Sequence, residues 1–431
     1  MPGTSLAYRG TVRLARMILP AAAAFDAKLA RGHQGRQGAL ERLCTWAARE
    51  RDRARPLLWF HAPSVGEGLQ AEAVLGPIRG RHPDWQIVYT HFSPSAEALA
   101  RRVGASVSDY LPYDTPEAAR RLLHALTPAA LVFSKLDLWP ELATSTAASG
   151  VPVALIAATV RPGSGRLRWP VRALLEPGYR ALSAVAAVDA PDAERLAALG
   201  ARREVIHVLG DPRSDSVADK VAAVRRDDPL LQFGRGAPTL VAGSTWPGDE
   251  AVLLEAFRNV RSRHPTARLI LVPHEPIESH LAAVEASADR QGLPEVTRLS
   301  AATEAVPLLL VDRVGVLAAL YGAGSLAYVG GGFHAAGLHS VLEPAAWGVP
   351  VIFGPRWRES RDAATLVDAG GAVALPNSGA AEVLAATWDR WLTDAAARAH
   401  AGQQARAVID AGLGAAERSA KMVEGLVGSK K

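Results

Sequence analysis

The stretch from Ser325 to Pro355 limits the possible folds of this chain more than any other, because it has the order of a parallel βαβ unit. An apolar run at 325–329 leads into three successive glycines, and a second apolar run at 349–353 follows Gly348. Between them, the segment 338–347 has the composition of a helix. A strand, a glycine loop, a helix and a second strand predict two neighbouring parallel strands joined by a crossover helix.

The glycine loop and the predicted helix together indicate a binding site for a nucleotide. Gly331 and Gly332 carry no side chains, so a phosphate or another backbone can approach this loop closely. The helix expected to begin near Leu338 would point unpaired N–H groups at the same space. Glu343 in that helix would take two ribose hydroxyls of a sugar nucleotide. The alternative is a glycine loop that serves packing alone.

Length, cysteine content and charge exclude several classes of protein. A chain of 431 residues exceeds what one hydrophobic core usually serves, so we expect two domains. The single cysteine, Cys44, excludes an internal disulfide and a cysteine metal cluster. The formal net charge is +5, but residues 1–56 contain eleven Lys and Arg against four Asp and Glu, a net of +7 that leaves −2 for the rest. A basic end on a nearly neutral body, without basic aromatic patches, argues against a nucleic-acid partner.

Residues 1–56 are expected to associate with a membrane surface. From Leu6 to Leu19, apolar residues and arginines alternate at roughly helical spacing. The longest uncharged run, Met17 to Phe25, is far shorter than the roughly 20 residues that a membrane-spanning helix needs. A basic amphipathic helix of this kind can lie on the anionic cytoplasmic face of a membrane. The alternatives are a secretory signal and an ordinary solvated first helix.

Residues 57–210 are interpreted as a first domain that contains a doubly wound parallel sheet. Its apolar runs alternate with helical stretches, and they are Leu57–Ala62, Gln86–Thr90, Ala129–Phe133, Val151–Ala157 and Ala184–Val188. In such sheets, ligands bind beyond the carboxyl ends of the strands.

The first of these runs is followed by Ser64-Val65-Gly66-Glu67, which makes Glu67 the candidate catalytic base. A carboxylate at a strand end can take the proton of an attacking hydroxyl that lies within hydrogen-bond reach. Gly66 is expected to permit a tight turn, and Ser64 and Gly66 are candidate contacts to the substrate. The alternative is that Glu67 only complements the dipole in the first turn of a helix.

Charged residues after two further strands are candidate substrate contacts. Lys135 and Asp137 follow the run that ends at Phe133, and Lys135 can meet a phosphate or carboxylate of a ligand. A Lys135–Asp137 pair at the surface is the alternative. Arg161 borders a Pro-Gly-Ser-Gly loop, a flexible basic lip that suits an anionic acceptor. As a surface arginine it would need no ligand.

The chain is expected to change domain after Gly210. Residues 211–236 break the periodicity and form the predicted linker, residues 237–400 form a nucleotide-sugar-binding domain, and residues 401–431 form a helix that crosses back to the first domain. The first strands predicted in the second domain are Thr239–Ala242, Arg268–Val272 and Pro307–Val311. The segment 312–321 that follows them is predicted to be a helix.

Loops after these strands supply further candidate contacts to the donor. Ser244 and Thr245 can donate to phosphate oxygens, or they serve as plain helix caps. His274 is a candidate donor to a phosphate or a base, although a loop histidine is more often merely exposed. His334 and His339 lack a third ligand at metal-binding spacing, so no metal site is predicted.

The order of short motifs resembles the Kdo (3-deoxy-D-manno-octulosonic acid) transferases of lipopolysaccharide synthesis, nearly end to end. The motifs are SVGE, LPYD, LDLWPEL, GDPRSD, AGSTWPGDE and LEPAAWGVPVIFGP. The resemblance implies an α/β protein of the GT-B glycosyltransferase fold, in which two Rossmann-like domains face a cleft. It also implies CMP-Kdo as donor and a lipid A precursor as acceptor, at the cytoplasmic face of the inner membrane. By position it makes Glu67 the base and assigns contacts with CMP to Pro273, His274, Gly315, Val316, Leu317, Ser340, Val341, Leu342 and Glu343.

Four motifs depart from the family pattern. The usual Glu-Thr-Glu is replaced by Lys-Leu-Asp at 135–137, which reverses one charge. The usual Pro-Arg-His is replaced by Pro-His-Glu at 273–275, which loses an arginine able to bind phosphate in bidentate fashion. Ser340 stands in place of an asparagine, and residues 157–161 replace Asn-Ala-Arg-Leu-Ser. These changes affect the predicted identity of the sugar and of the acceptor more than the predicted fold.

Together these features predict an inverting transfer of Kdo from CMP-Kdo to a lipid A precursor. Glu67 takes the proton of the acceptor hydroxyl, while loop amides and the helix near Leu338 stabilise the departing CMP. No metal is expected, and no cofactor besides the donor substrate. Two rival hypotheses stay open: a GT-B transferase that uses another nucleotide sugar, and a non-catalytic, membrane-associated binding protein that keeps the fold.

Overall fold

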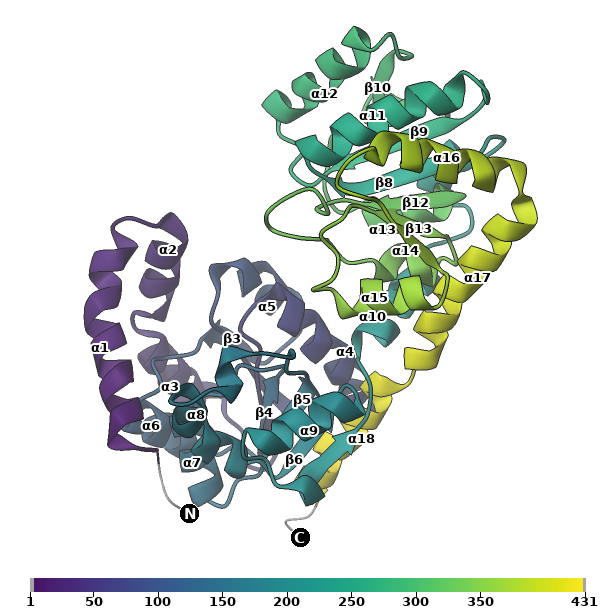
Figure 1. Ribbon diagram of the computed structural model, residues 1–431. Helices are drawn as coiled ribbons and strands as arrows, with labels where there is room; N and C mark the ends of the chain where they lie inside the picture. The colour runs from purple at the N-terminus through teal and green to yellow at the C-terminus, as the bar shows by residue number, and fades with distance from the viewer. Residues whose placement is uncertain (1–3, 429–431) are drawn as a thin grey trace. The chain divides into compact units, whose positions relative to one another are not determined.

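The computed structural model describes residues 4–428, and its chain divides into two compact units (Figure 1). The first unit comprises residues 1–216 together with 413–431, and the second comprises residues 217–412. The second unit thus begins earlier and ends later than the predicted domain, and α10 (Arg213–Ala223) occupies the start of the segment predicted as a linker. Within residues 4–428, no helix combines the length and the apolar character that crossing a membrane requires.

The first unit contains a sheet of seven parallel strands in the order β3-β2-β1-β4-β5-β6-β7. The strands are β1 (Leu57–His61), β2 (Gln86–His91), β3 (Val107–Tyr110), β4 (Ala130–Ser134), β5 (Val153–Ala158), β6 (Ala184–Ala187) and β7 (Ile206–Val208). All residues of β1, β2, β4, β5 and β6 are buried, which explains their near-continuous apolar sequences. The strand order reverses between β1 and β4, and ligands of doubly wound sheets bind at this switch point.

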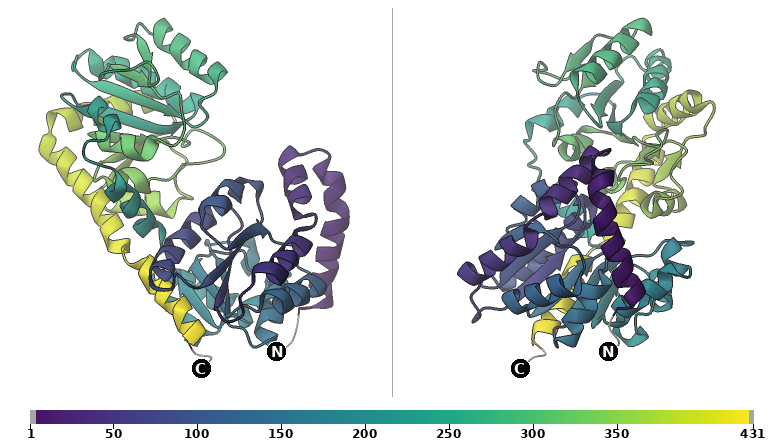
Figure 2. Two further views of the ribbon diagram at one scale, coloured as in Figure 1. Left: turned by 180° about the vertical axis from the view of Figure 1, so that it is seen from behind. Right: turned by 90° about the vertical axis from the view of Figure 1, so that its left-hand side faces the viewer.

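Helices from both ends of the chain pack on this sheet. They are α3 (Ala39–Glu50), α4 (Val65–Arg81), α5 (Glu97–Arg102), α6 (Pro116–Leu126), α7 (Pro140–Ala148), α8 (Val171–Arg180), α9 (Ala190–Ala198) and α18 (Ala415–Gly428). The C-terminal helix α18 lies against α4, where Ala420 and Val423 join the buried cluster that contains Val74 (Figure 2). Of the C-terminal helices, α18 is the one that belongs to the first unit.

The N-terminal segment forms a helical hairpin of α1 (Leu6–Ala23) and α2 (Ala27–Arg36), which lie side by side in the views of Figures 1 and 2. Asp26 starts the second helix, because its carboxylate accepts two backbone N–H groups of α2. The start of α1 is fixed to the unit by the Arg9 guanidinium, which donates to Glu141 at 2.9 Å.

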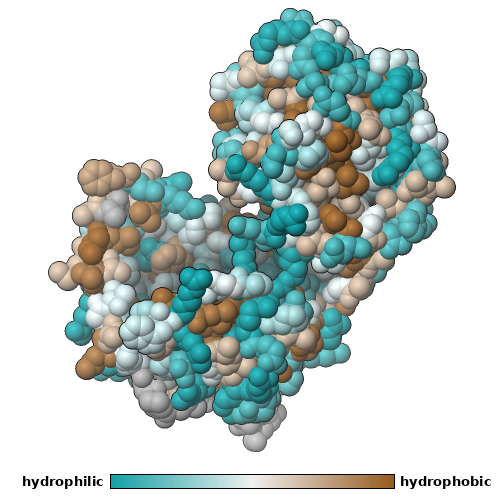
Figure 3. All heavy atoms as spheres, in the orientation of Figure 1, coloured by the Kyte–Doolittle hydropathy of each residue, from teal (hydrophilic) through white to brown (hydrophobic). Residues whose placement is uncertain are grey.

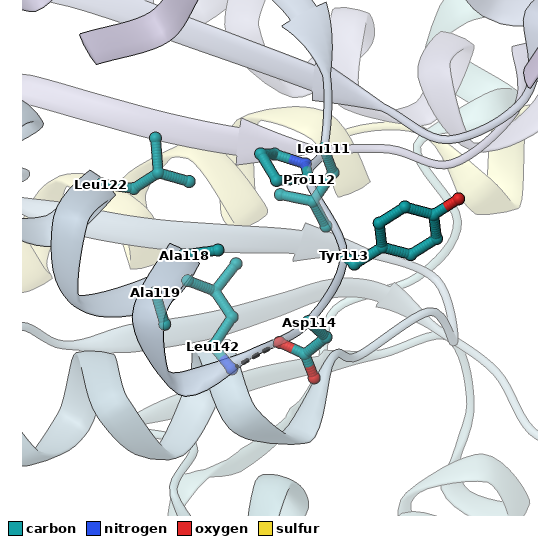
Figure 4. Close-up of a pocket in the computed structure, with 8 residues that line it drawn as sticks. All are labelled: Leu111, Pro112, Tyr113, Asp114, Ala118, Ala119, Leu122 and Leu142. Atoms are coloured by element: carbon teal, nitrogen blue, oxygen red, sulfur yellow. Dashed lines mark hydrogen bonds between the residues drawn. The ribbon is translucent and has the colours of Figure 1, made fainter. Parts of the chain in front are cut away.

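Asp114 is the buried acceptor that joins α1 to α7. Its carboxylate accepts from the Tyr8 hydroxyl at 2.6 Å and from the backbone N–H groups of Glu141 and Leu142 at 2.9 and 2.8 Å. Figure 4 shows the carboxylate turned toward the first turn of α7. Burial raises the pKa of Asp114 to about 6, although these hydrogen bonds work in the opposite direction.

The second unit repeats the parallel architecture with a sheet in the order β10-β11-β9-β8-β12-β13-β14. The strands are β8 (Thr239–Thr245), β9 (Arg268–Pro273), β10 (Val296–Arg298), β11 (Leu308–Leu310), β12 (Leu326–Val329), β13 (Val351–Phe353) and β14 (Ala372–Ala374). The helices are α11 (Pro247–Arg261), α12 (Glu278–Arg290), α13 (Leu317–Leu320), α14 (Leu342–Ala346), α15 (Arg361–Asp368), α16 (Ala380–Thr393) and α17 (Ala395–Gly412). The order reverses between β8 and β12, so this unit has a switch point of its own.

Two predicted helices of the second unit are much shorter than expected. The segment 338–347 is helical only as the five-residue α14, and the segment 312–321 only as the four-residue α13. The backbone N–H of His339 donates to the carbonyl of Gly330 at 3.1 Å, so residues before α14 pack against the glycine loop instead of continuing the helix. The prediction that a helix begins near Leu338 is therefore wrong.

Candidate active site

Glu67 lies at the switch point of the first sheet, in the first turn of α4, directly after β1. Its side chain is 15% exposed, so the carboxylate is largely shielded yet reachable from solvent. One carboxylate oxygen accepts from the Ser64 hydroxyl, which leaves Ser64 without a capping bond to the helix backbone. The structure thus places the predicted base and the predicted contact Ser64 next to each other.

Lys135 follows β4, the neighbouring strand, and its ammonium contacts Glu67. The Nζ–Oε1 distance is 2.9 Å. Lys135 has a φ of +66°, a conformation that few residues other than glycine and asparagine adopt. The preceding Ser134 donates its hydroxyl to the Glu67 carbonyl at 2.9 Å, so β4 holds both the side chain and the backbone of Glu67.

These contacts keep Glu67 ionised. Burial by itself would raise the pKa of the carboxyl, but the charge of Lys135 and the hydrogen bonds from Ser64 and Lys135 outweigh it. The pKa of Glu67 therefore lies below its ordinary value. An ionised, largely shielded carboxylate at a strand end is equipped to accept a proton from a bound hydroxyl.

Asp137 does not join this pair. Arg166 donates to the Asp137 carboxylate at 2.7 Å and to the Leu136 carbonyl at 3.0 Å. The predicted alternative of a Lys135–Asp137 pair is thus wrong, since each residue has a different partner. Arg161 lies exposed in the turn after β5.

Gly66 is an open position and not a tight turn. It has an ordinary helical place in α4, and a Cβ built there would meet no atom within 4 Å. The prediction of a tight turn at Gly66 is wrong, but the empty space beside Glu67 is compatible with the predicted contact to a substrate.

His61, the buried last residue of β1, contacts Trp139, and the sequence patterns assigned neither residue a role in the site. The Trp139 indole N–H donates to His61 Nε2 at 3.0 Å, and burial lowers the pKa of His61 to about 3. His61 is therefore a neutral acceptor that orients the indole. The available signal was the Trp-Pro pair at the start of α7, which also indicates a helix start.

In the second unit, Ser244 and Thr245 end β8 and Trp246 follows them, so all three lie at the switch point. Ser244 is half-buried and has a φ of +54°. Thr245 is fully buried and its hydroxyl donates to Glu250 at 2.8 Å. Thr245 is therefore at odds with its predicted contact to a phosphate, because its hydroxyl is already bonded inside the fold.

The glycine loop after β12 is explained by close packing. Gly331 donates its N–H to Asp249 at 2.9 Å, and a Cβ on Gly332 would come within 2.5 Å of Gly354 Cα. Gly331 also has a φ of +93°, which favours glycine. The packing alternative thus accounts for both glycines. A phosphate site built on the Gly331 amide and on a following helix is not what the structure contains.

Three histidines gather around Trp246 at the same switch point. The rings of Trp246 and His334 stack with centroids 3.8 Å apart and planes 2° apart, and His274 stacks with Trp246 at 4.9 Å. The Trp246 indole N–H donates to His339 Nε2 at 3.0 Å. Burial, together with His274 and His334, lowers the pKa of His339 to about 4, so this acceptor is neutral. Of these four residues, the sequence predicted a donor contact only for His274, which follows Pro273 at the end of β9.

The other predicted donor contacts lie on α13 and α14 and in the short segments directly before them. Glu343 is half-buried and accepts from Lys220 of α10 at 3.3 Å, a partner that sequence spacing gave no means to find. Ser340 is exposed and Gly315 has a φ of +87° in the turn before α13. The remaining members of this set are the half-buried Val316 and Leu317 and the buried Val341 and Leu342. A hydrogen bond from the Trp347 indole to the Ala318 carbonyl, at 2.7 Å, ties the two short helices together.

No cluster of three or more His, Cys, Asp or Glu side chains within residues 4–428 is arranged to hold a metal ion.

Comparison with known proteins gives consistent matches. Residues 37–216 match the family model described as 3-deoxy-D-manno-octulosonic-acid transferase (kdotransferase). Over 386 residues, the chain is 30% identical to the 3-deoxy-D-manno-octulosonic acid transferase of Bordetella pertussis, a span of 86% of this chain and 87% of that protein. Over 299 residues it is 26% identical to the enzyme of the same description from Haemophilus influenzae, a span of 69% and 70%.

Among solved structures, the chain resembles the UDP-GlcNAc 2-epimerase from Neisseria meningitidis with a TM-score of 0.62. The sequence identity is 12%, and the likeness covers 86% of this chain and 100% of the other. At this identity the likeness concerns the fold alone. Together with the two parallel sheets, it confirms the predicted GT-B fold of two Rossmann-like units.

Proposed function

Because this chain belongs to the 3-deoxy-D-manno-octulosonic acid (Kdo) transferase family, we propose that it transfers Kdo from CMP-Kdo to a lipid A precursor in lipopolysaccharide synthesis. Kdo transfer makes the protein a glycosyltransferase. The observation that carries the proposal is the ionised Glu67 carboxylate at the switch point of the first sheet, within the residues that match the family model.

The proposed reaction is one in-line displacement with inversion at the anomeric carbon of Kdo. A bond forms between the acceptor hydroxyl oxygen and that carbon, while the bond from the carbon to the CMP phosphate breaks. CMP leaves with the electron pair, and Glu67 takes the hydroxyl proton as the oxygen attacks. A positioned base of this kind contributes about 10²- to 10⁴-fold to the rate.

We assign the donor nucleotide to the switch point of the second unit. His274, Ser340 and Glu343 are the polar side chains there that the family resemblance assigns to CMP. Of these, His274 and Glu343 are each held by a neighbouring side chain. Trp246 stacks on His274, and Lys220 pairs with Glu343. The glycine loop does not supply the predicted amides. We therefore propose that these side chains make most of the contacts with the donor nucleotide.

We place the protein at the cytoplasmic face of the inner membrane through the hairpin of α1 and α2. The apolar side chains of α1 and the following turn project into solvent, with Leu6 85%, Met17 77% and Phe25 93% exposed. Figure 3 shows brown side chains over the part of the surface where Figure 1 places α1. Arg13 and Arg16 lie exposed among them and can meet anionic headgroups.

Flotation with anionic vesicles tests this placement. The wild-type protein is expected to float with vesicles that contain phosphatidylglycerol, and the double variant Met17→Asp, Ile18→Asp is expected to stay in solution. Ile277→Asp, at an exposed apolar position of the second unit, serves as the control. Equal flotation of all three proteins would contradict the placement.

The activity is tested by incubation with CMP-Kdo and a tetra-acylated lipid A precursor, followed by mass analysis of the lipid. A product heavier by one or more Kdo residues is the expected result. An unchanged lipid, obtained with protein that has a cooperative thermal transition, would refute the proposed activity.

A transferase for a different nucleotide sugar is the second candidate, and His274 is the observation that favours it. It occupies the position of an arginine in the family pattern and is engaged in the stack with Trp246. Thermal shifts with CMP, UDP and GDP separate the two candidates, because a preference for UDP or GDP would exclude CMP-Kdo as the donor. Absence of binding to all three would favour a non-catalytic binding protein.

A further inference from the structure

The ammonium of Lys135, beside the proposed base Glu67, can still donate hydrogen bonds to a ligand. The hydrogen bond to Glu67 uses one of the three N–H donors of the Lys135 ammonium, and 40% of the Lys135 side chain is exposed. Within residues 4–428, Lys135 is the cation paired with Glu67. The other titratable group coupled to Glu67 is Tyr89, whose buried phenol has a raised pKa and carries no charge near neutrality.

The backbone holds this cation in place. At φ +66°, the Lys135 N–H donates to the Ile156 carbonyl at 2.8 Å, which fixes the end of β4 against β5. Ser134 bonds the Glu67 carbonyl from the same strand end. The ammonium is therefore preorganised at the base and does not reach it from a flexible surface loop.

The chemical structure of the transferred sugar indicates what the Lys135 ammonium can bind. In a ulosonic acid, the carboxylate is attached to the anomeric carbon, which is the carbon that the hydroxyl attacks. When Glu67 lies within hydrogen-bond reach of that hydroxyl, the sugar carboxylate must lie within several ångströms of Glu67. Two carboxylates this close repel each other and disfavour binding, unless a cation lies between them.

We propose that Lys135 binds the carboxylate of the ulosonic acid while it stays paired with Glu67, and so makes the site specific for an acidic sugar. This inference rests on the proposed Kdo transfer, and it assigns Lys135 the role of a specificity-determining residue. A neutral sugar would offer the exposed donors of the ammonium no charged acceptor to replace water, and an acidic sugar would offer a carboxylate. The family pattern has a glutamate at this position, so the arrangement belongs to this chain.

Steady-state kinetics with Lys135→Asn and Lys135→Arg test the inference. Asparagine adopts positive φ readily, so Lys135→Asn removes the charge without new backbone strain. It is expected to raise the KM for CMP-Kdo about 10- to 100-fold, the range for losing a hydrogen bond to a charged group. Lys135→Arg is expected to recover most of this loss. Lys421→Asn, which removes an exposed lysine of α18, is the matched control.

A pH profile separates a charge effect from a merely structural one. Without the ammonium, the pKa of Glu67 rises, so the acidic limb of kcat/KM is expected to move to higher pH in Lys135→Asn and to stay in place in Lys421→Asn. An unmoved limb together with an unchanged donor KM would overturn the inference.

Further measurements identify the anion that Lys135 binds. Those made by calorimetry do not depend on turnover. Free Kdo is expected to bind the wild type by calorimetry and to bind Lys135→Asn at least tenfold more weakly, whereas the neutral Kdo amide should bind both equally. Equal binding of free Kdo would overturn the inference. If the variant instead raises the KM only for a phosphorylated acceptor and not for its dephosphorylated form, the anion is the acceptor phosphate and the inference is wrong. Failure of the wild type to transfer Kdo refutes the proposed function, while the calorimetry still decides the role of Lys135.

Discussion

The switch points of the two sheets hold opposite kinds of chemistry. In the first unit, the ends of β1 and β4 carry an ion pair, Glu67 with Lys135. In the second unit, the ends of β8 and β12 carry stacked rings around Trp246, with His339 neutral because burial depresses its pKa. The two parallel sheets are built alike, so the difference resides in a few loop residues. The fold supplies two equivalent positions. In our proposal, their side chains make one position suited to proton transfer and the other to binding the donor.

The largest effect is expected at Glu67, the residue of the first unit that we propose takes the proton. Glu67→Gln keeps the size of the side chain and its bond to Ser64 but removes the proton acceptor, so kcat is expected to fall about 10²- to 10⁴-fold. Glu72→Gln, on the same helix, is the control that should keep wild-type turnover. Transfer at near wild-type rate by Glu67→Gln would show that Glu67 is not the base.

The ring cluster should affect binding of the donor and not the chemical step. Trp246→Ala removes the stacks with His334 and His274 and the bond to His339, so the KM for the donor is expected to rise about 5- to 50-fold with a smaller change in kcat. Trp85→Ala, at the amino end of β2 and away from either switch point, serves as the control. A fall in kcat alone would place the cluster in the chemical step and end the contrast between the units.

Gly332 and Gly66 should also differ in how they tolerate an added methyl group. Gly332→Ala forces a Cβ to within 2.5 Å of the Gly354 backbone and is expected to lower the free energy of unfolding by about 1–3 kcal/mol. Gly66→Ala meets open space inside α4 and is expected to leave that free energy unchanged or slightly higher. Chemical denaturation of both variants provides the measurement, and equal losses would contradict the distinction between a packing glycine and an open one.

The smallest effect concerns pH and stability. The pKa of His339 is lower in the folded state, about 4, than its ordinary value of 6.5, so the unfolded chain binds more protons between these pH values. Stability that His339 contributes near pH 7 should therefore be lost as the pH falls from 6.5 to 4. In His339→Gln, which can still accept from Trp246, this loss is expected to shrink by about 1–2 kcal/mol, allowing for partial exposure to solvent. Identical losses in both proteins would show that the ring is not shielded.

The core of each unit and the position of Glu67 followed from local sequence. The buried strands β1, β4 and β5 are continuous apolar runs, because helices cover both faces of a parallel sheet and leave no polar alternation. A short motif after the first run placed Glu67 at a strand end, and the order of strands then brought it to the switch point.

The glycine loop shows where local patterns mislead. Glycine is required both where a phosphate approaches a backbone and where another backbone does, and a sequence does not distinguish the two. Gly331 and Gly332 meet the second requirement, through Asp249 and Gly354. The helix predicted after them failed for a related reason, since the N–H of His339 bonds a distant carbonyl instead of one four residues back.

The sequence by itself determined the two αβ units, the parallel strands and the residue types offered at each strand end. Only the tertiary structure decided which of these residues meet, namely Lys135 with Glu67 and not with Asp137, and Trp246 with three histidines. The reason is physical. Burial and periodicity are properties of neighbours along the chain, whereas an ion pair or a ring stack depends on distances between strand ends that are far apart in sequence and adjacent only in the folded sheet.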